Sequence, residues 1–399
     1  MKILQLCNRV PYPPTDGGSI AMHSLSQSLI AQGAEVKIFA MNTSRHNINV
    51  ASLPENYKAK TGIEAVEIDT RIKPTAALLN LFTSASYNVI RFDKPAVHAK
   101  VRSLLSENEF DVVQFESIFC APYLKTVKEN SDAKCLLRAH NVEHLIWQRM
   151  ADGSSSLKKK YLKLLSKRLK NYERSVLPQF DAVLPMTSND SKIFSEYAPS
   201  VLQKIVPIGL SADVYPYNEH QKEELCLFHL GAMDWLPNRE AVEWFLERCW
   251  FDVKEKFPHL KLYLAGRGFP ESLKIDDGNI IYNDEIKNAV EYMQGKAIMI
   301  APVLSGSGMR VKILQAFALG KAVVSTTIGA EGIECLNGEN ILIADSPGDF
   351  ISSIEKLVND ISLRNRIGMN ARRLFLEKYS AERIADDVIR FYQTLIAKK

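Results

Sequence analysis

Two successive runs of alternating strand-like and helix-like segments are the feature that most constrains this fold. In the first run, apolar and β-branched stretches such as Ile3–Cys7 and Val36–Ala40 alternate with helical patterns such as Ala21–Ala31 and Ala96–Leu105. This alternation predicts a parallel sheet with helices on both faces. Further strands of the first run are expected at Asp111–Phe115, Cys135–Arg138, Ala182–Pro185 and Ile205–Pro207.

A polar segment at 209–224 separates the two runs, because it carries proline and shows no apolar period. We therefore expect an α/β protein with two doubly wound, Rossmann-like domains facing a central cleft, since ligands bind at the carboxyl ends of such strands. The first domain is expected over 1–208 and the second over 209–380, and the final helix in 381–399 can return to the first domain. Strands of the second run are expected at Leu225–Leu230, Leu260–Ala265, Asn279–Tyr282, Ala297–Ala301 and Ala322–Ser325, with helices at Glu240–Glu247, Glu285–Met293, Met309–Leu319, Phe350–Val358, Leu363–Tyr379 and Ala381–Ala397.

The composition narrows the class of protein. The 399 residues are 46% apolar and 24% charged, which is ordinary for a globular chain with two cores. A net charge of +4 does not indicate a nucleic-acid binder. The six cysteines show no metal-ligand spacing, which favours a reducing, cytoplasmic compartment. No run reaches the roughly 18 to 20 apolar residues that span a bilayer, so contact with a membrane would be peripheral.

The segment 301–333 carries the strongest sign of chemistry. It reads as a strand, a loop of small residues at Ser305–Gly308, a helix, a glycine stop and another strand. Backbone N–H groups of such a loop and the positive end of the helix dipole suit a diphosphate. Arg310 and Lys312 add positive charge, which would stabilise a nucleoside diphosphate as it leaves. The alternative is an ordinary strand–loop–helix connection with a solvated arginine and lysine.

The helix that follows the loop offers one further polar group. Gln315 lies two turns past the loop, about 10 Å along a helix of standard rise. This separation suits contact with a ribose while the loop holds the phosphates.

The motifs of this segment resemble the donor-site signature of retaining GT-B glycosyltransferases of group 1, also called family 4. The resemblance rests on Pro302, the Ser305–Gly308 loop, the sequence GKAVVST at 320–326 and GAEG at 329–332. A branch of that family found in surface-polysaccharide clusters carries two further motifs. They correspond here to GAMDWLPN at 231–238 and HNVE at 140–143, so the resemblance covers essentially the whole chain.

This resemblance implies a donor site in the second domain. Arg267 and Gly268 would approach the nucleotide. The backbone of Glu285–Ile286 would contact the base, and Glu331 would contact a sugar hydroxyl. Each of these could equally be a loop residue. The full donor set expected from the resemblance is Gly231, Arg267, Gly268, Glu285, Ile286, Ser305, Gly306, Ser307, Gly308, Met309, Gln315 and Glu331.

The chain also departs from the family pattern. Two glutamates eight positions apart are replaced by Ser307 and Gln315, and an arginine and a lysine five apart are replaced by Ala232 and Pro237. An amide still hydrogen-bonds a ribose hydroxyl but carries no charge. We therefore expect Arg310 and Lys312 to supply the charge that the phosphates need.

Two polar clusters of the first domain follow predicted strands. One cluster, Asp16, Gly17 and Gly18, ends a Pro-rich loop at the start of a helix. In similar enzymes a glycine pair at this place lies beside the donor phosphates and the acceptor. The simpler interpretation is a rigid turn. His140 and its neighbours lie at the end of Cys135–Arg138, where His140 is expected to be catalytic. Asn141 and Glu143 belong to the same cluster, and Glu143 is expected to orient His140 or to bind a hydroxyl. The alternative is a helix start in which Asn141 is the cap and Glu143 lies in the first turn.

The segment Leu157–Leu177 is strongly basic and has an apolar stripe at helical spacing. It suits either a helix on anionic lipid or a helix packed on the first sheet with a solvated basic face.

The sequence thus predicts a cytoplasmic retaining glycosyltransferase of hexosyltransferase type in surface-polysaccharide biosynthesis. Its partners would be a nucleotide-sugar donor, a glycan or lipid-linked acceptor and, through Leu157–Leu177, the inner membrane face, but no nucleic acid. The resemblance implies front-face attack in which the leaving phosphate takes the acceptor proton, with no metal and no cofactor. A GT-B-fold nucleotide-sugar epimerase and a non-catalytic GT-B-like assembly partner are the alternatives.

Overall fold

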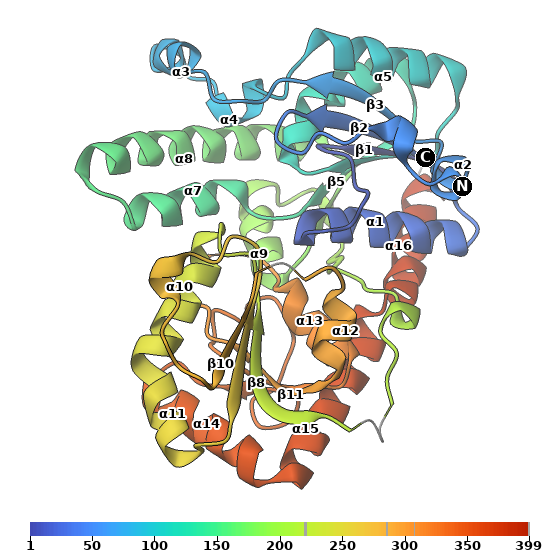
Figure 1. Cartoon of the computed structure of the whole chain (residues 1–399). Coiled ribbons are helices and arrows are strands. Elements are labelled where there is room, and N and C mark those ends of the chain that lie inside the picture. The colour runs from blue at the N-terminus through green and yellow to red at the C-terminus, as the bar shows by residue number, and fades with distance from the viewer. Residues whose placement is uncertain (219–221, 285, 307, 398–399) are drawn as a thin grey trace. The chain divides into compact units, whose positions relative to one another are not determined.

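The computed structural model describes residues 1–218, 222–284, 286–306 and 308–397, without the side chains of Ser156 and Leu157. The chain divides into two compact units (Figure 1). Unit 1 comprises Met1–Gly209 with Ile384–Lys399, and unit 2 comprises Leu210–Arg383. The last helix, α16 (Ala381–Ala397), therefore gives most of its length to unit 1.

Unit 1 is built on a seven-stranded parallel sheet with the order β3-β2-β1-β4-β5-β6-β7. Its strands are β1 (Lys2–Cys7), β2 (Glu35–Thr43), β3 (Glu64–Ile68), β4 (Val112–Glu116), β5 (Lys134–Ala139), β6 (Ala182–Pro185) and β7 (Leu202–Gln203). Its other helices are α1 (Gly17–Ala31), α2 (Glu55–Thr61), α3 (Pro74–Asn80), α4 (Tyr87–Ile90), α5 (Pro95–Glu107), α6 (Leu124–Asn130), α7 (Glu143–Asp152), α8 (Ser156–Val176) and α9 (Ser188–Tyr197).

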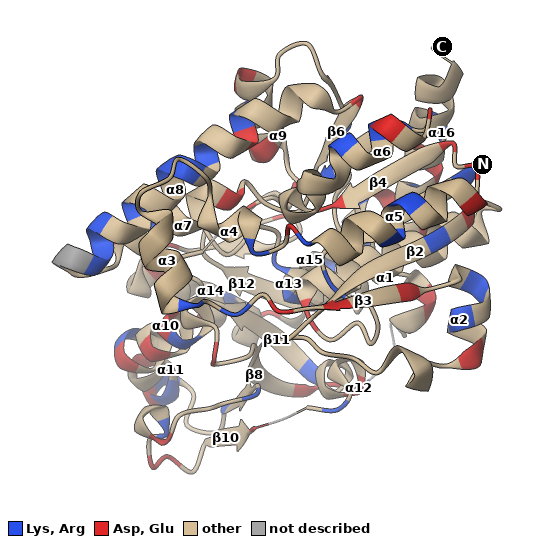
Figure 2. Ribbon diagram, turned by 90° about the horizontal axis from the view of Figure 1, so that it is seen from above, with Lys and Arg blue, Asp and Glu red and all other residues tan. Residues whose placement is uncertain are grey.

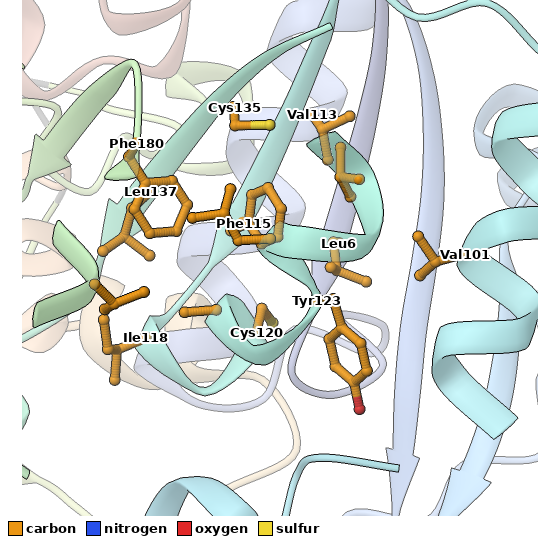
Figure 3. Packing of buried hydrophobic residues seen from close by; sticks show 14 of the residues in the cluster. Leu6, Val101, Val113, Phe115, Ile118, Cys120, Tyr123, Cys135, Leu137 and Phe180 are labelled. Carbon is orange, nitrogen blue, oxygen red and sulfur yellow. The ribbon is translucent and has the colours of Figure 1, made fainter. Parts of the chain in front are cut away.

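Side chains of β1 alternate between two buried layers, as the period of a strand requires. Ile3 and Cys7 enter a layer formed with α1 and α16, which contributes Tyr392. Leu4 and Leu6 enter the opposite layer with α5 and α6 (Figure 3). A strand buried on both faces is typical of parallel sheets covered by helices.

Unit 2 repeats this architecture with a six-stranded parallel sheet in the order β10-β9-β8-β11-β12-β13. Its strands are β8 (Glu224–Leu230), β9 (Lys261–Ala265), β10 (Ile280–Asn283), β11 (Lys296–Ala301), β12 (Ala322–Ser325) and β13 (Leu342–Ile343). Its helices are α10 (Leu236–Phe245), α11 (Phe251–Lys256), α12 (Ala289–Gln294), α13 (Val311–Ala318), α14 (Pro347–Asn359) and α15 (Ile361–Leu374).

Each sheet runs outward from its first strand in one direction and then returns to the other side of that strand. The reversal lies between β1 and β4 in unit 1 and between β8 and β11 in unit 2. In doubly wound folds ligands bind outside the carboxyl ends of the strands at this point. The fold thus directs attention to the loops after β1 and β4, and after β8 and β11.

The strand predictions differ from the structure in one wrong strand and two missed strands. The strand expected at Ile205–Pro207 is wrong, because β7 ends at Gln203 and only single backbone bonds such as Val206 N to Pro185 O (2.8 Å) continue the pairing. The strands β3 and β13 were missed. β3 is an edge strand whose side chains are mostly half-buried, so its sequence EAVEI lacks an apolar run.

Candidate active site

The loops after β8 and β9 lie against each other at the strand ends of unit 2. Gly231 N donates to Ala265 O at 2.9 Å, and Met233 N donates to Arg267 O at 2.8 Å. Gly266 has φ +148°, and a Cβ there would overlap the carbonyl of Gly231, so only glycine permits this approach. The structure therefore brings together three predicted donor residues, Gly231, Arg267 and Gly268.

The predicted phosphate loop, Ser305–Gly308, follows β11 at the switch point of unit 2, and its residue 307 lies outside the described residues. Ser305 Oγ donates to Glu240 Oε2 of α10 at 2.6 Å. Gly306 has φ +95°, and a Cβ on it would be 3.2 Å from both Arg310 Nη2 and Pro237 Cγ. The shape of the loop is thus set by α10 on one side and by Arg310 on the other.

Arg310 holds the loop from within. Its guanidinium donates to Gly308 O at 2.8 Å and to Ser305 O at 3.2 Å, and lies 5.4 Å from the ring centroid of Trp235. Only 9% of the residue is exposed. Direct contact of Arg310 with a phosphate stays a prediction, whereas its role in shaping the loop is visible in these bonds.

Lys312 differs from Arg310 because it has no ion pair or side-chain hydrogen bond within the described part of the chain. It lies in the first turn of α13 and is partly buried. Burial lowers the pKa of its ammonium group to about 8. A desolvated cation without an anionic partner beside a glycine loop is an electrostatic feature that a bound anion would complete.

Gln315 lies deeper than its predicted ribose contact requires. It is buried, and its Nε2 donates to Tyr215 Oη at 2.9 Å. Its Oε1 is buried and has no hydrogen-bond partner among the described residues. Contact with a ribose hydroxyl would therefore have to use Oε1.

The other predicted donor residues follow β10, β11 and β12. Met309 is buried, whereas Ile286 and Glu331 are partly buried. Glu285 and Ser307 lie outside the described residues.

Unit 1 contains a cavity of about 680 Å³ where its own strand order reverses. Of the residues predicted for the acceptor side, Gly18, His140, Asn141 and Glu143 line it, whereas Asp16 and Gly17 do not. The complete lining is Asn8, Arg9, Gly18, Met22, Thr43, Ser44, Arg45, His46, Thr70, Arg71, Ile72, Arg91, Phe92, Ser117, Phe119, His140, Asn141 and Glu143.

The N-terminus of α1 already holds an anion from its own chain. The Asp16 carboxylate accepts from Gly18 N at 3.0 Å and Ser19 N at 3.1 Å, and Arg9 Nη1 donates to it at 2.8 Å. Burial would raise the pKa of Asp16, but Arg9 and the two backbone bonds lower it. Gly18 allows this arrangement, because a Cβ there would collide with Arg9 Nη2. Asp16 therefore acts as a helix cap rather than a free cavity group.

Glu116, at the end of β4, is a site residue that the motif-based analysis missed. It is fully buried, and its carboxylate contacts His140 Nε2 at 2.5 Å, Gln5 Nε2 at 2.6 Å and Arg138 Nη1 at 3.5 Å. Burial would raise the pKa of Glu116, but Arg138 and the hydrogen bonds lower it to about 2. The signal that could have found it is a glutamate at the end of a mostly apolar strand.

Glu116 fixes the state of His140. Burial lowers the pKa of His140, so the ring is neutral at pH 7. Since the ionised Glu116 carboxylate only accepts hydrogen bonds, Nε2 carries the ring hydrogen and Nδ1 is left as an acceptor. The His140 ring is hydrogen-bonded to Glu116 and not to Glu143, which was expected to orient it.

Glu143 lines the cavity and has a carboxyl group whose pKa is close to neutral pH. Burial and the neighbouring charge of Glu173 raise its pKa to about 7. Asn141 Nδ2 donates to Glu143 Oε1 at 3.3 Å, and Glu143 N donates to Glu173 Oε1 at 2.9 Å. The alternative of a helix start is confirmed, because α7 begins at Glu143, but its cap is wrong, because the N-cap residue is Val142 and not Asn141.

The described residues contain no group of three or more histidine, cysteine or acidic side chains that could hold a metal ion.

Comparison with known proteins places a family model on unit 2. Residues 224–360 match the model described as glycosyl transferases group 1. The chain is 25% identical over 408 residues to an uncharacterised 44.6 kDa protein in the cps region of Klebsiella pneumoniae, covering 98% of this chain and 99% of that protein. It is 28% identical over 121 residues to the capsular polysaccharide biosynthesis glycosyltransferase CapM of Staphylococcus aureus, covering 30% and 31% of the two chains.

Solved structures extend the likeness of fold to the whole chain. Sucrose-phosphate synthase from Thermosynechococcus elongatus matches with a TM-score of 0.72 at 13% identity and covers 100% of both chains. Anabaena HepE in complex with UDP-glucose matches with a TM-score of 0.66 at 12% identity, covering 99% of this chain and 100% of HepE. Residues 224–360 therefore form a glycosyl transferase group 1 domain, and the chain has the GT-B fold with two parallel, Rossmann-like sheets.

Proposed function

We propose that this protein is a retaining glycosyltransferase that moves a hexose-type sugar from a nucleotide-sugar donor to a glycan or lipid-linked acceptor. The observation that carries the proposal is the glycine-containing loop after β11, at the switch point of a group 1 domain, with Lys312 in the helix that follows; Lys312 has no anionic partner among the described residues. The kind of donor is supported by HepE, a structural neighbour that binds UDP-glucose. A role in surface-polysaccharide biosynthesis is supported by the names of the CapM and Klebsiella relatives.

In this proposal unit 2 promotes departure of the nucleoside diphosphate. Negative charge grows on the phosphate oxygen as its bond to the sugar breaks, and donors fixed in advance stabilise that charge. The backbone of Gly306 and Gly308 leaves room for close approach, and Lys312 adds positive charge. Arg310 keeps the loop carbonyls turned toward its own guanidinium and away from the anion.

In unit 1 the proposed acceptor site is the cavity beside His140. Neutral His140 offers Nδ1 as a hydrogen-bond acceptor to a hydroxyl of the acceptor that does not react, which positions the acceptor, while Glu116 holds the ring from the opposite nitrogen. The acceptor oxygen then bonds to the anomeric carbon on the face that the phosphate leaves, and the phosphate takes the proton. Configuration at that carbon is retained, and no metal or cofactor takes part, so EDTA should leave the rate unchanged.

The acceptor cavity favours ligands that carry negative charge. Four arginines and two histidines line it, against one carboxyl group. Arg9 and Arg71 are paired with Asp16 and Asp69. Arg91 donates to Thr70 O at 2.7 Å, and no carboxylate pairs with it within the described part of the chain. A phosphate-bearing or acidic acceptor would supply that missing charge.

We further propose that the enzyme works in the cytoplasm at the inner membrane face, where lipid-linked acceptors are found. The predicted contact is the basic helix α8, which covers Leu157–Leu177 except its last residue; the Leu157 side chain lies outside the described residues. The buried Leu162, Leu165 and Leu169 fit the alternative of a packed helix with a solvated basic face, and contact with anionic lipid stays a prediction. Among the described residues, no helix is long and apolar enough to cross a bilayer.

A nucleotide-sugar panel tests the proposed function. Thermal shift with the full chain identifies the donor, because a ligand that binds the folded state raises its stability. NMR of the sugar released or transferred then reports its configuration. Retained configuration supports the proposal; inversion contradicts it. An isomerised donor would identify an epimerase, and binding without turnover under any acceptor would identify a non-catalytic partner.

A further inference from the structure

A row of polar side chains crosses the face of the unit 1 sheet that packs against α1 and α16. It consists of Gln5 on β1, Gln114 and Glu116 on β4, and Arg138 on β5. All four residues are at most 1% exposed, although Val112, on the same face of β4, belongs to an apolar layer. Buried polar groups are costly unless they are hydrogen-bonded, so the partners of this row decide what it does.

The C-terminal helix supplies one of these partners. Tyr392 of α16 is fully buried, and its hydroxyl donates to Gln114 Oε1, 278 positions away in the sequence. Burial and the charge of Glu116 raise the pKa of Tyr392, so its hydroxyl keeps the proton at neutral pH. Figure 2 shows α16 beside β4, and Val112 and Tyr392 belong to the same buried layer. The end of the chain thus reaches the centre of the sheet.

The hydrogen bonds from Tyr392 run in one direction, toward Glu116. An ionised carboxylate only accepts, so Gln114 has to turn its Nε2 toward Glu116 Oε1, as it does in the structure. The carbonyl of Gln114 then faces Tyr392, which meets it as a donor. The other carboxylate oxygen, Oε2, accepts from His140 Nε2 at 2.5 Å. The four side chains form a continuous line of hydrogen bonds, which we term the Tyr392 network: Tyr392, Gln114, Glu116 and His140.

Two further groups contact Glu116 Oε1, but neither holds Gln114. Gln5 Nε2 donates to Oε1 at 2.6 Å, and Arg138 Nη1 lies 3.5 Å from it. Gln5 and Arg138 also donate to backbone carbonyls of α1, at 3.4 Å and 2.9 Å. Within the described part of the chain, the Gln114 side chain is hydrogen-bonded to Tyr392 and Glu116 alone. Tyr392 is therefore the group that fixes the orientation of the Gln114 amide.

We propose that Tyr392 is a positioning residue for His140 and acts through Gln114 and Glu116. With its amide fixed, Gln114 holds one oxygen of the Glu116 carboxylate, and the other oxygen stays aimed at His140 Nε2. The ring is then kept as the tautomer with hydrogen on Nε2, which leaves Nδ1 as an acceptor. The inference rests on the proposed function, in which His140 positions the acceptor, and it extends that site to the C-terminal helix.

Packing alone does not require this pair of polar side chains. Phenylalanine at 392 and methionine at 114 would fill much the same space in an apolar layer without removing a hydroxyl and an amide from water. The hydrogen bond between Tyr392 and Gln114 offsets that cost of burial. What the apolar pair would lack is the donor that Gln114 presents to Glu116.

The first test observes the His140 ring in the full chain by NMR with isotope-labelled histidine. His140→Asn identifies its signals among the eight histidines. At neutral pH the wild type should show one tautomer, with hydrogen on Nε2 and well-separated shifts for the two ring nitrogens. Tyr392→Phe should mix the two tautomers and bring these shifts closer together, because the carboxylate that selects Nε2 is held less firmly.

Tyr123→Phe is the matched control for the loss of a buried hydroxyl. Tyr123 is fully buried in unit 1, and its hydroxyl donates to Phe92 O and accepts from Lys94 N at 3.2 Å. It lies outside the Tyr392 network. Tyr123→Phe should therefore lower the free energy of unfolding, as Tyr392→Phe does, but leave the His140 tautomer unchanged.

A double variant separates positioning from stability. Tyr392→Phe leaves Gln114 Oε1 without a donor, and Gln114→Met leaves the Tyr392 hydroxyl without an acceptor, so each should lower the urea midpoint. With both polar partners removed in Tyr392→Phe/Gln114→Met, the midpoint should return toward the wild-type value. The His140 tautomer should not recover, because Glu116 still lacks the Gln114 amide. A purely structural role of Tyr392 would restore both properties together.

Kinetics connect the network to sugar transfer. The assay uses the donor found with the nucleotide-sugar panel and octyl glucoside as the probe acceptor. Tyr392→Phe should lower kcat/KM for the acceptor about two- to tenfold, the change that one hydrogen bond corresponds to. The KM for the donor should stay unchanged, because the network lies in unit 1 and the proposed phosphate loop in unit 2.

The outcomes separate this inference from the proposed function. If Tyr392→Phe unfolds more easily but keeps the wild-type tautomer, as expected of Tyr123→Phe, Tyr392 is structural only and the inference is overturned. An altered tautomer with unchanged kcat/KM would overturn the step from His140 to the acceptor. If the wild type transfers no sugar from any donor, the proposed function falls, whereas the tautomer still decides whether Tyr392 positions His140.

Discussion

Replacement of Lys312 by methionine should stabilise the empty protein and weaken its binding of nucleoside diphosphates. Methionine matches the length of the lysine stem but removes the charge. Lys312 is partly buried in the first turn of α13 without a described partner, so its charged form is penalised by desolvation. The same charge becomes favourable once a diphosphate lies beside it.

The size of the effect follows from the lysine pKa. Folding lowers it from 10.5 to about 8. A tenfold change in a protonation constant is about 1.4 kcal/mol, so burying the charged form costs on the order of 3 kcal/mol at neutral pH. Because the unfolded chain binds more protons between pH 8 and 10.5, the wild-type free energy of unfolding should rise with pH across that window. The variant should lack this rise.

Donor binding should change in the opposite direction. A hydrogen bond to a charged group contributes about 1.5 to 3 kcal/mol, which corresponds to roughly a 10- to 150-fold higher Kd. Urea unfolding measures the first effect, and calorimetric titration with the nucleoside diphosphate of the preferred donor measures the second. Lys356→Met is the control, since Lys356 is exposed on α14. Unchanged stability together with unchanged diphosphate affinity in Lys312→Met would refute the reasoning.

The remaining predictions concern buried groups and one glycine. Glu116→Gln should lower the rate of sugar transfer at least about tenfold, because it releases His140; an assay of product formation measures this. It should also remove the part of the wild-type free energy of unfolding that is lost as pH falls from 4.5 toward 2, which acid unfolding measures. The raised pKa of Glu143 lets the wild-type folded state bind more protons than the unfolded state, so its free energy of unfolding should fall as pH rises from 4.5 to about 7. Glu143→Gln should remove this fall. A wild-type free energy of unfolding, measured with urea, that stays constant over that range would contradict this. Gly266→Ala should destabilise unit 2 by about 2–4 kcal/mol, since its Cβ overlaps the Gly231 carbonyl at φ +148°, whereas Gly278→Ala, with nothing within 4 Å, should have little effect on the melting temperature.

Some parts of this structure could be read from the sequence because their signals are local. Ala182–Pro185 and Ala322–Ser325 are strands with the predicted ends, and α16 spans the predicted Ala381–Ala397. Buried parallel strands are continuous apolar runs, so their limits are visible in the residues themselves. The edge strands β3 and β13 have no such signal, since only one side of each is paired within its sheet.

The features of the candidate site also differ in whether the sequence could predict them. The small residues after β11, the nearby cations and the histidine after β5 were evident from sequence, because glycine and charge at strand ends have recognisable chemical meaning. Sequence could not show that Arg310 is engaged by its own loop, or that Asp16 fills the N-terminus of α1. Those facts depend on which donor meets which acceptor after packing.

The sequence by itself determined two parallel α/β units, the positions of most strands and the loops that deserve attention. Only the tertiary structure decided that Glu116 holds His140, 24 residues further along the chain, that Lys312 is left without a described partner, and that Arg168 fixes the end of α3 beside α8. The physical reason is that periodicity and loop composition act over a few residues. Burial, charge pairing and exposure are properties of neighbours that the chain brings together only when it folds.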